Sequence, residues 1–304
     1  MWSGCLLARP LSESMGEPLA FPYVIRHEKL ELRIAISNIA DLHLHEEVVP
    51  ELLEALVRTV DSDGCLKHPV IVDDSSHVVL DGMHRVAALQ RLGCIRSPVC
   101  FVDYRNPAIT VGCWYRAFQG AEALGGVVAE VERMSFDVEP VTDIDDERIG
   151  VSPVLAAVKT RDSDYLVRAS FGDLKAAYDR VKTVEEGLRA SSFEVLYETE
   201  DDALRMLQGG VVDAVLLTPR LTKDYIVRTA LSGAVFAYKA TRHVVPARPL
   251  HVDVPLSLLR GGEAVGAVNE ELRRRLERRR LRFVSAGTVF RGRRYEEAVY
   301  VFEG

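Results

Sequence analysis

The chain has 304 residues, of which 48% are hydrophobic and 27% are charged. This length predicts two domains, and the composition excludes a disordered or a collagen-like chain. The formal net charge of −7 at pH 7 disfavours a protein whose whole surface coats nucleic acid, because such proteins are usually basic.

Membrane association and a disulfide framework are also not expected. The longest apolar runs are far shorter than the ~20 residues of a membrane span. Residues 1–10 lack the basic region and the long apolar region of a signal peptide, so a cytoplasmic protein is predicted. The five cysteines are odd in number and form no Cys-x-x-Cys pair, which disfavours a zinc ribbon and a disulfide scaffold.

The first half of the chain is predicted to mix strands with two helices. The expected strands are 31–40, 69–72, 77–80 and 97–103, and the expected helices are 50–60 and 86–92. Pro50 suits the first turn of the first helix and Gly93 the end of the second. A polar turn is expected over 41–47.

The second half alternates between helix and strand, which is typical of an α/β fold. The expected helices are 121–134, 173–188, 201–207 and 222–231, and the expected strands are 154–158, 165–169, 193–197, 211–217 and 234–238. The tail differs from both halves. Seven arginines fall within 269–283, which is expected to form a basic helix.

The sharpest local signal is Asp81–Arg85, between a predicted strand and a predicted helix. Backbone N–H groups at a helix N-terminus are unpaired and the helix dipole adds positive charge there, while Gly82 permits close approach of a ligand. His84 and Arg85 suit charge-assisted hydrogen bonds to phosphate, and Asp81 suits Mg²⁺ beside that phosphate. The segment predicts a phosphate cradle; the alternative is an ordinary turn with Asp81 as the helix N-cap.

Three weaker signals accompany this turn. His45-Glu46-Glu47 precedes the first long helix, where acidic residues are also expected from the helix dipole alone. Lys239-Ala-Thr-Arg-His243 follows a predicted strand and suits a carboxylate or phosphate, although a solvated loop has a similar composition. Trp114 is the third, and a lone tryptophan is more often a core residue than a ligand platform.

Taken in chain order, these motifs resemble the ParB/sulfiredoxin-like superfamily, and within it most closely the archaeal free L-serine kinases that use ADP. A related bacterial branch uses ATP. The family motifs are a His-Glu turn, Asp-Gly-His-His-Arg, Trp-Tyr and Lys-x-Thr-Arg-His, matched here by His45-Glu46, Asp81-Gly-Met-His-Arg85, Trp114-Tyr115 and Lys239-Ala-Thr-Arg-His243. The resemblance spans roughly 30–250.

Sulfiredoxins fit less well, because Met83 stands where their catalytic cysteine lies. Chromosome-partition ParB proteins usually have Gly-Glu-Arg-Arg at this turn.

The resemblance implies a fold class of α/β (α+β) and three regions. A ParB/sulfiredoxin-like nucleotide-binding catalytic domain would cover 20–108, and a second α/β domain over 109–250 would complete the serine site. Residues 251–304 would form an Arg-rich C-terminal extension.

The resemblance also implies an activity, in which ADP or ATP phosphorylates the hydroxyl of free L-serine to give O-phospho-L-serine for cysteine biosynthesis. Glu46 would be the general base, and Asp81 would assist catalysis and hold Mg²⁺. The donor phosphates would be bound by Gly82, Met83, His84 and Arg85. Serine and its new phosphate would be bound by Trp114, Lys239, Thr241, Arg242 and His243.

Two features depart from the family pattern. Met83 replaces the first histidine of the family pair, which removes one phosphate donor unless backbone N–H groups take its place. The Arg-rich tail extends past the usual end of the family, and it motivates an alternative function as a nucleotide-binding, ParB-like DNA-binding regulator. A third hypothesis is a kinase scaffold that has lost activity through Met83. The choice between ADP and ATP, and the oligomeric state, are not readable from the sequence.

Overall fold

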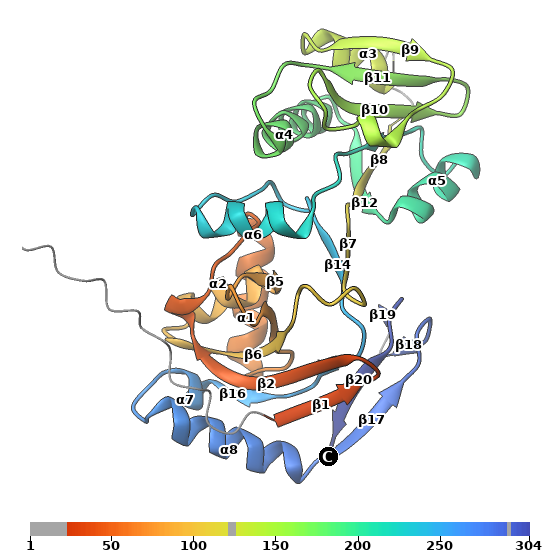
Figure 1. Cartoon of the computed structure of the whole chain (residues 1–304). Coiled ribbons are helices and arrows are strands. Elements are labelled where there is room, and N and C mark those ends of the chain that lie inside the picture. The colour runs from red at the N-terminus through yellow and green to blue at the C-terminus, as the bar shows by residue number, and fades with distance from the viewer. Residues whose placement is uncertain (1–22, 121–125, 291–292) are drawn as a thin grey trace, which may run out of the picture.

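The structure is a computed structural model that describes residues 23–120, 126–290 and 293–304. Within these ranges two main sheets lie one above the other, joined by a narrow two-stranded ribbon (Figure 1). The mixed α/β class expected from the sequence is confirmed. No helix in the described ranges has the length and apolar character needed to cross a membrane.

The N-terminal sheet has five strands in the order β1-β2-β6-β4-β5. These are β1 Tyr23–His27, β2 Leu30–Asn38, β4 Val70–Asp73, β5 Val79–Asp81 and β6 Arg96–Val102. β4 and β6 pair in parallel and the other neighbours are antiparallel. Every residue of β6 is buried, as expected for a central strand covered on both faces. Two helices, α1 (Pro50–Asp63) and α2 (Met83–Arg91), pack beside this sheet.

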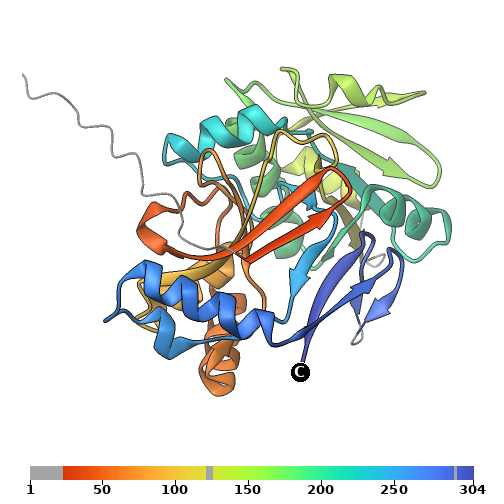
Figure 2. The same ribbon diagram turned by 60° about the horizontal axis from the view of Figure 1, so that its bottom comes forward.

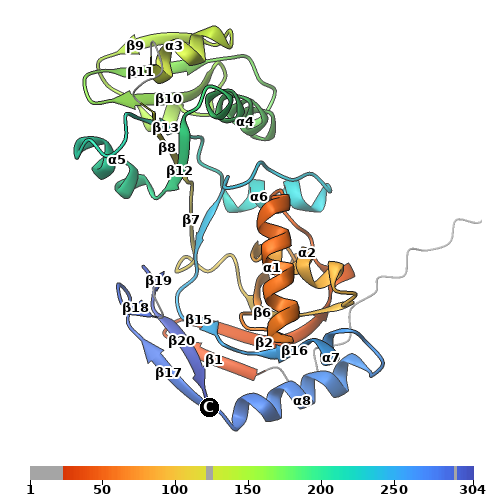
Figure 3. The ribbon, with the colours of Figure 1, turned by 180° about the vertical axis from the view of Figure 1, so that it is seen from behind.

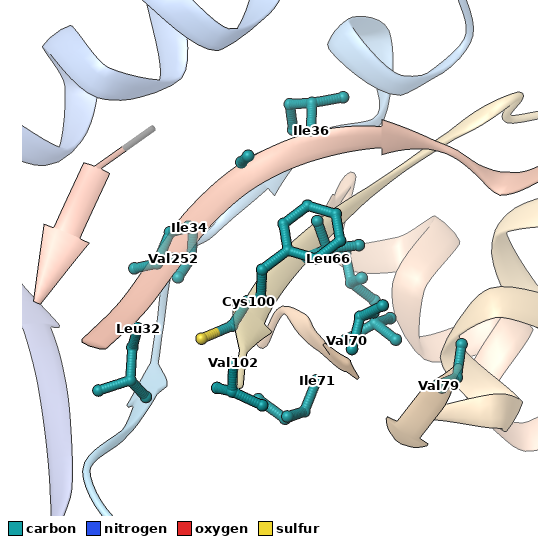
Figure 4. Packing of buried hydrophobic residues seen from close by; sticks show 14 of the residues in the cluster. Leu32, Ile34, Ile36, Leu66, Val70, Ile71, Val79, Cys100, Val102 and Val252 are labelled. Atoms are coloured by element: carbon teal, nitrogen blue, oxygen red, sulfur yellow. The ribbon is translucent and has the colours of Figure 1, made fainter. Parts of the chain in front are cut away.

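The C-terminal segment packs on the same sheet rather than standing apart from it (Figure 2). Helix α8 (Val265–Glu277) lies across β2, where buried Asn269 accepts a hydrogen bond from the backbone N–H of Ile36 at 2.7 Å and donates to its carbonyl at 3.2 Å. Val252 packs among the apolar residues of β2 and β6 (Figure 4). Residues on both sides of position 250 therefore share one core, and the division of the chain into domains stays a prediction.

The remaining C-terminal elements are short. They are α7 Leu256–Leu259, β15 Arg248–Leu250, β16 Val254–Pro255, β17 Arg280–Val284, β18 Val289–Phe290, β19 Arg293–Arg294 and β20 Val299–Glu303. β15, β20 and β17 form a three-stranded sheet, and β16 pairs with β3 (Cys65–Leu66) of the N-terminal half.

The second main sheet has six antiparallel strands in the order β12-β8-β13-β10-β11-β9. These are β8 Tyr115–Gln119, β9 Asp137–Val141, β10 Val154–Thr160, β11 Asp164–Arg168, β12 Glu194–Glu198 and β13 Ala214–Leu217. Helices α3 (Gly126–Arg133) and α4 (Leu174–Ala190) share one core with this sheet, and α5 (Glu200–Gln208) shares another. Both faces of the sheet are therefore covered.

The ribbon between the sheets is formed by β7 (Thr110–Gly112) and β14 (Arg242–Val244), which pair antiparallel (Figure 3). Helix α6 (Lys223–Leu231) lies beside it. Short 3₁₀ helices cover Ile39–Asp41 and Asp146–Arg148.

Two elements differ from those expected. The strand over 234–238 is wrong, because this segment has only an isolated bridge between Phe236 and Glu46. The basic helix over 269–283 is wrong at its end, because α8 stops at Glu277 and β17 follows. The helix expected over 121–134 begins at Gly126, and 121–125 lie outside the described residues.

Candidate active site

One cleft of about 560 Å³ is lined by all the residues that the sequence selected. They are Glu46, Asp81, Gly82, Met83, His84, Arg85, Trp114, Lys239, Thr241, Arg242 and His243. The cleft opens where the carboxyl end of β5 and the start of α2 meet the β7–β14 ribbon. Segments about 200 positions apart in the chain, such as Glu46 and Thr241, thus form one site.

Glu46 lies at the bottom of the cleft and is only 5% exposed. Its Oε1 atom accepts hydrogen bonds from the backbone N–H of Thr241 at 2.6 Å and from the Thr241 hydroxyl at 2.5 Å. Its Oε2 atom accepts a longer bond, 3.3 Å, from the backbone N–H of Lys239. The carboxylate is therefore held in a fixed orientation by the loop that precedes β14.

His45 is fully buried behind Glu46. Its Nδ1 lies 2.6 Å from the carbonyl oxygen of Val79, and its Nε2 lies 2.8 Å from the Thr241 hydroxyl. Burial lowers the pKa of His45, against the opposing effect of the nearby Glu46 carboxylate. This ring therefore joins β5 to the loop before β14.

Asp81 is held by two guanidinium groups and is not a helix cap. Its Oδ2 atom lies 2.9 Å from Arg85 and 2.7 Å from Arg248. The N-cap of α2 is instead Gly82, with no side-chain capping bond, so the alternative in which Asp81 serves only as the N-cap is wrong. Arg85 also donates to the carbonyl oxygens of His68 and Pro69, so in this structure it positions the turn.

The N-terminus of α2 faces the cleft as the phosphate-cradle prediction requires. Gly82 has a φ of +114°, and a Cβ atom there would lie 2.9 Å from the Arg85 Cζ atom. His84 Nε2 accepts the backbone N–H of Val49 at 3.0 Å, and burial lowers the pKa of His84. The ring is therefore neutral at pH 7 and donates through Nδ1, without the charge assistance that we expected from the sequence. Met83 packs against the N-terminal core.

Trp114 and Lys239 form the opposite wall. The Lys239 Nζ lies 3.9 Å from the centre of the Trp114 ring, and the indole N–H donates to the Thr241 carbonyl at 2.9 Å. Fully buried Arg116 fixes this arrangement, because it donates to the carbonyl oxygens of Trp114 and Lys239 at 2.7 and 3.2 Å and pairs with Glu185. Arg116 was not selected from the sequence.

Of the last two predicted residues, Arg242 lies at the rim of the cleft and His243 lies in its interior. Arg242 pairs with Glu296. His243 is buried, its Nε2 lies 2.7 Å from the Tyr104 hydroxyl, and burial lowers its pKa well below the usual range.

The sequence reasoning missed the contribution of the C-terminal segment to the cleft. Tyr295, Glu296 and Glu297 line it, and Arg248 bridges Asp81 and Glu297 at 2.7 Å each. The available signals were a single arginine within the apolar run 244–250, and an acidic pair just before the last apolar strand.

The residues present fit a metal ion that arrives with phosphates, rather than a metal centre built by the protein alone. Across residues 23–120, 126–290 and 293–304, no group of three or more metal-ligating side chains occurs. Mg²⁺ is commonly held by one or two carboxylates plus substrate phosphates. Asp81, at the edge of the cradle, is one of the carboxylates that line the cleft.

Comparison with known proteins gives L-serine kinases and a ParB-like protein as relatives. No family model matches the chain. The ADP-dependent L-serine kinase of Thermococcus kodakarensis is 29% identical over 222 residues, covering 71% of this chain and 88% of that protein. The ATP-dependent L-serine kinase of Staphylothermus marinus is 28% identical over 224 residues, covering 71% of this chain and 87% of that protein.

A solved structure of a free serine kinase in complex with AMP matches with a TM-score of 0.63 at 25% identity, covering 74% of this chain and 93% of that one. The resemblance seen in the motifs is confirmed, because the homologues of this chain are ADP- and ATP-dependent L-serine kinases together with a ParB-like protein.

Proposed function

We propose that this protein is a kinase of free L-serine, which transfers the terminal phosphoryl group of ADP or ATP to the serine hydroxyl. The observation that carries the proposal is the convergence of the selected residues on one cleft, in a chain whose relatives are L-serine kinases. We also propose that it acts in the cytoplasm and that its product feeds cysteine biosynthesis.

Glu46 acts as the base in this proposal. An alcohol is a poor nucleophile until a nearby group accepts its proton in the transition state. The Glu46 carboxylate lines the cleft and is anchored by backbone N–H groups of Lys239 and Thr241, so it is oriented before the substrate arrives.

The donor nucleotide would lie along the start of α2. The backbone N–H groups after Gly82, with neutral His84, suit the phosphates, and the adjoining apolar lining of Leu56, Leu80 and Met83 suits a purine base. Mg²⁺, when bound with those phosphates at Asp81, would neutralise part of their charge. Phosphoryl transfer depends mainly on such positioning and charge neutralisation, so replacement of the family histidine by Met83 is compatible with activity.

Serine would bind between this cradle and the wall formed by Trp114 and Lys239. The ammonium of Lys239 and the guanidinium of Arg242 suit the serine carboxylate and the product phosphate. Because Arg242 is paired with Glu296, binding of an anion there involves exchange of that partner.

A direct assay tests this function and the identity of the donor. Purified protein is incubated with L-serine, Mg²⁺ and either ADP or ATP, and phosphoserine and the nucleotide product are measured. Phosphoserine with AMP identifies an ADP-dependent enzyme, and phosphoserine with ADP identifies an ATP-dependent one. Absence of phosphoserine with both donors would contradict the proposal.

The alternative DNA-binding function draws little support from the surface of α8. Arg273, Arg274 and Arg275 pair with Glu270, Glu271 and Glu277 of the same helix. Paired arginines contribute less to phosphate binding, because their charge is already compensated. Retention on duplex DNA that falls steeply with salt would favour this alternative.

A further inference from the structure

We propose that Thr241 and His45 form a hydrogen-bonded relay that holds the proton taken up by Glu46. This inference rests on the proposed function, since it assigns two positioning residues to the base of that reaction. Both residues act through Glu46.

The Thr241 hydroxyl lies between two groups that compete for its proton. Its Oγ1 atom is 2.5 Å from Glu46 Oε1 and 2.8 Å from His45 Nε2. On the other side of the imidazole, Nδ1 lies 2.6 Å from the Val79 carbonyl oxygen. A carbonyl oxygen only accepts hydrogen bonds, so Nδ1 carries a proton. A hydroxyl donates one hydrogen bond, so with a neutral His45 and an ionised Glu46 only one of these two contacts of the Thr241 hydroxyl is a hydrogen bond.

Two arrangements satisfy every contact, and each contains one additional proton. In the first, protonated Glu46 donates to Thr241, and the hydroxyl donates to neutral His45. In the second, a His45 imidazolium donates to the hydroxyl, which donates to the Glu46 carboxylate. The two arrangements differ in which end of the chain carries the additional proton, and a shift of both bridging protons converts one into the other. The chain of hydrogen bonds is complete only once the base has accepted a proton.

The surroundings of His45 favour the first arrangement. The ring is fully buried, which disfavours its charged form. It faces Glu46 and the Asp81 carboxylate, but Asp81 is itself paired with Arg248. The ring of His243 stands 5.3 Å away on β14 and is neutral because burial lowers its pKa.

The surroundings of Glu46 leave Thr241 as its route to a second proton acceptor. Besides His45, the titratable groups that face Glu46 are His84 of α2, Tyr238 of the loop before β14 and Tyr178 of α4, whose hydroxyl donates to backbone carbonyl oxygens. His84 already accepts the N–H of Val49. The backbone groups that contact Glu46, from Lys239 and Thr241, are donors.

The proton balance of the reaction agrees with this arrangement. Glu46 takes the proton of the serine hydroxyl while the serine oxygen bonds to the terminal phosphorus of the donor. The bond from that phosphorus to its bridging oxygen breaks, and the electron pair leaves with the nucleotide. The proton remains on Glu46, whose O–H donates to Thr241, which donates to His45 Nε2. Stabilising protonated Glu46 makes its carboxylate a stronger base at neutral pH.

Thr241→Val and Thr241→Ser form a matched pair for the test. Valine removes the hydroxyl, while the backbone N–H of residue 241 still anchors Glu46. We expect kcat to fall about 10-fold or more, and the acid limb of the kcat/KM profile to move down by about one pH unit, with the KM for the nucleotide unchanged. Serine restores the hydroxyl and returns the limb to the wild-type pH. His45→Gln, which cannot take up a proton, moves the limb in the same direction as valine.

An acid limb that stays in place in Thr241→Val, or that moves equally in Thr241→Ser, overturns the relay. A second measurement does not depend on turnover. In ¹⁵N NMR of histidine-labelled protein, the His45 Nε2 signal shows a pH-dependent inflection in the wild type and in Thr241→Ser, because proton uptake at Glu46 turns the hydroxyl of residue 241 toward His45. This inflection is lost in Thr241→Val and Glu46→Gln. If the inflection persists in Thr241→Val, the relay is contradicted whether or not the wild type forms phosphoserine. Absence of phosphoserine from the wild type would instead overturn the proposed function.

Discussion

At the scale of single residues, the site depends on charges buried together. Arg248 is 8% exposed and forms ion pairs with Asp81 and Glu297, while it also donates to the His243 carbonyl at 3.2 Å. Removing one member of a buried pair is costly, because the charge left behind is uncompensated. Arg248 therefore positions Asp81 at the edge of the proposed phosphate cradle.

Replacing Arg248 with alanine is expected to reduce both stability and activity. We predict that urea denaturation shows a loss of about 3–5 kcal/mol in the free energy of unfolding. Arg274→Ala, at an exposed pair on α8, serves as the control and changes it by at most about 1 kcal/mol. Equal losses of unfolding free energy in the two variants would show that the buried ion pairs of Arg248 stabilise the fold no more than an exposed pair does.

At the scale of elements, the geometry of the α2 N-terminus depends on one glycine. The φ of Gly82 is +114°, a conformation that L-residues rarely adopt, and a Cβ atom would press against the Arg85 guanidinium. Gly82 is the N-cap of α2, so its conformation sets how the first turn of the helix meets the cleft. Gly64 ends α1 with a φ of +65°, and a Cβ atom added there would meet nothing within 4 Å.

Alanine at these two glycines separates conformational strain from damage to the site. Gly82→Ala is expected to weaken nucleotide binding about 10-fold or more, because it displaces Arg85, and to cost about 1–3 kcal/mol of stability. Gly64→Ala is expected to cost about 1 kcal/mol of stability without a change in nucleotide affinity. Isothermal titration calorimetry measures both affinities; unchanged affinity in Gly82→Ala would argue against a nucleotide at this turn.

Elements were predicted well where local pattern decides them, and badly where long-range contacts do. The turn at Asp81–Arg85 follows from a strand, a glycine and a helix in sequence. The apolar segment 234–238 looks like a strand, but Phe236 exchanges backbone hydrogen bonds with the loop at His45 and Glu47. Arg248 lies 167 positions from Asp81, so no local pattern indicates their pairing.

At the scale of the whole molecule, buried histidines fix the N-terminal half and the β14 segment on the two sides of the cleft. His45 bonds the loop before β14, His243 of that strand bonds Tyr104 after β6, and His84 bonds Val49 before α1. Burial lowers the pKa of all three. Protonating His45 or His243 therefore opposes contacts between the N-terminal half and the β14 segment, and protonating His84 opposes its bond to Val49.

The folded protein is expected to lose stability as the pH falls from 7.5 to 5.5. In the unfolded chain the histidine pKa is about 6.5, so below that pH the unfolded state binds more protons than the folded state. At pH 5.5 each fully buried neutral histidine therefore lowers the free energy of unfolding, and half-buried His84 lowers it less. Urea titrations at both pH values measure the difference. His243→Gln should reduce it and His43→Gln, at an exposed position, should not; a pH-independent free energy of unfolding would contradict this account.

The central claim is that Glu46 is the base of a free L-serine kinase, and one paired measurement tests it most directly. Phosphoserine formation by the wild type and by Glu46→Gln is compared, with nucleotide affinity measured on both proteins. The amide has nearly the shape of the carboxylate but accepts no proton. The account predicts phosphoserine from the wild type, a loss of about 10²–10⁴-fold in Glu46→Gln, and similar nucleotide affinities. Comparable phosphoserine formation by the two proteins, or none from the wild type, would contradict it.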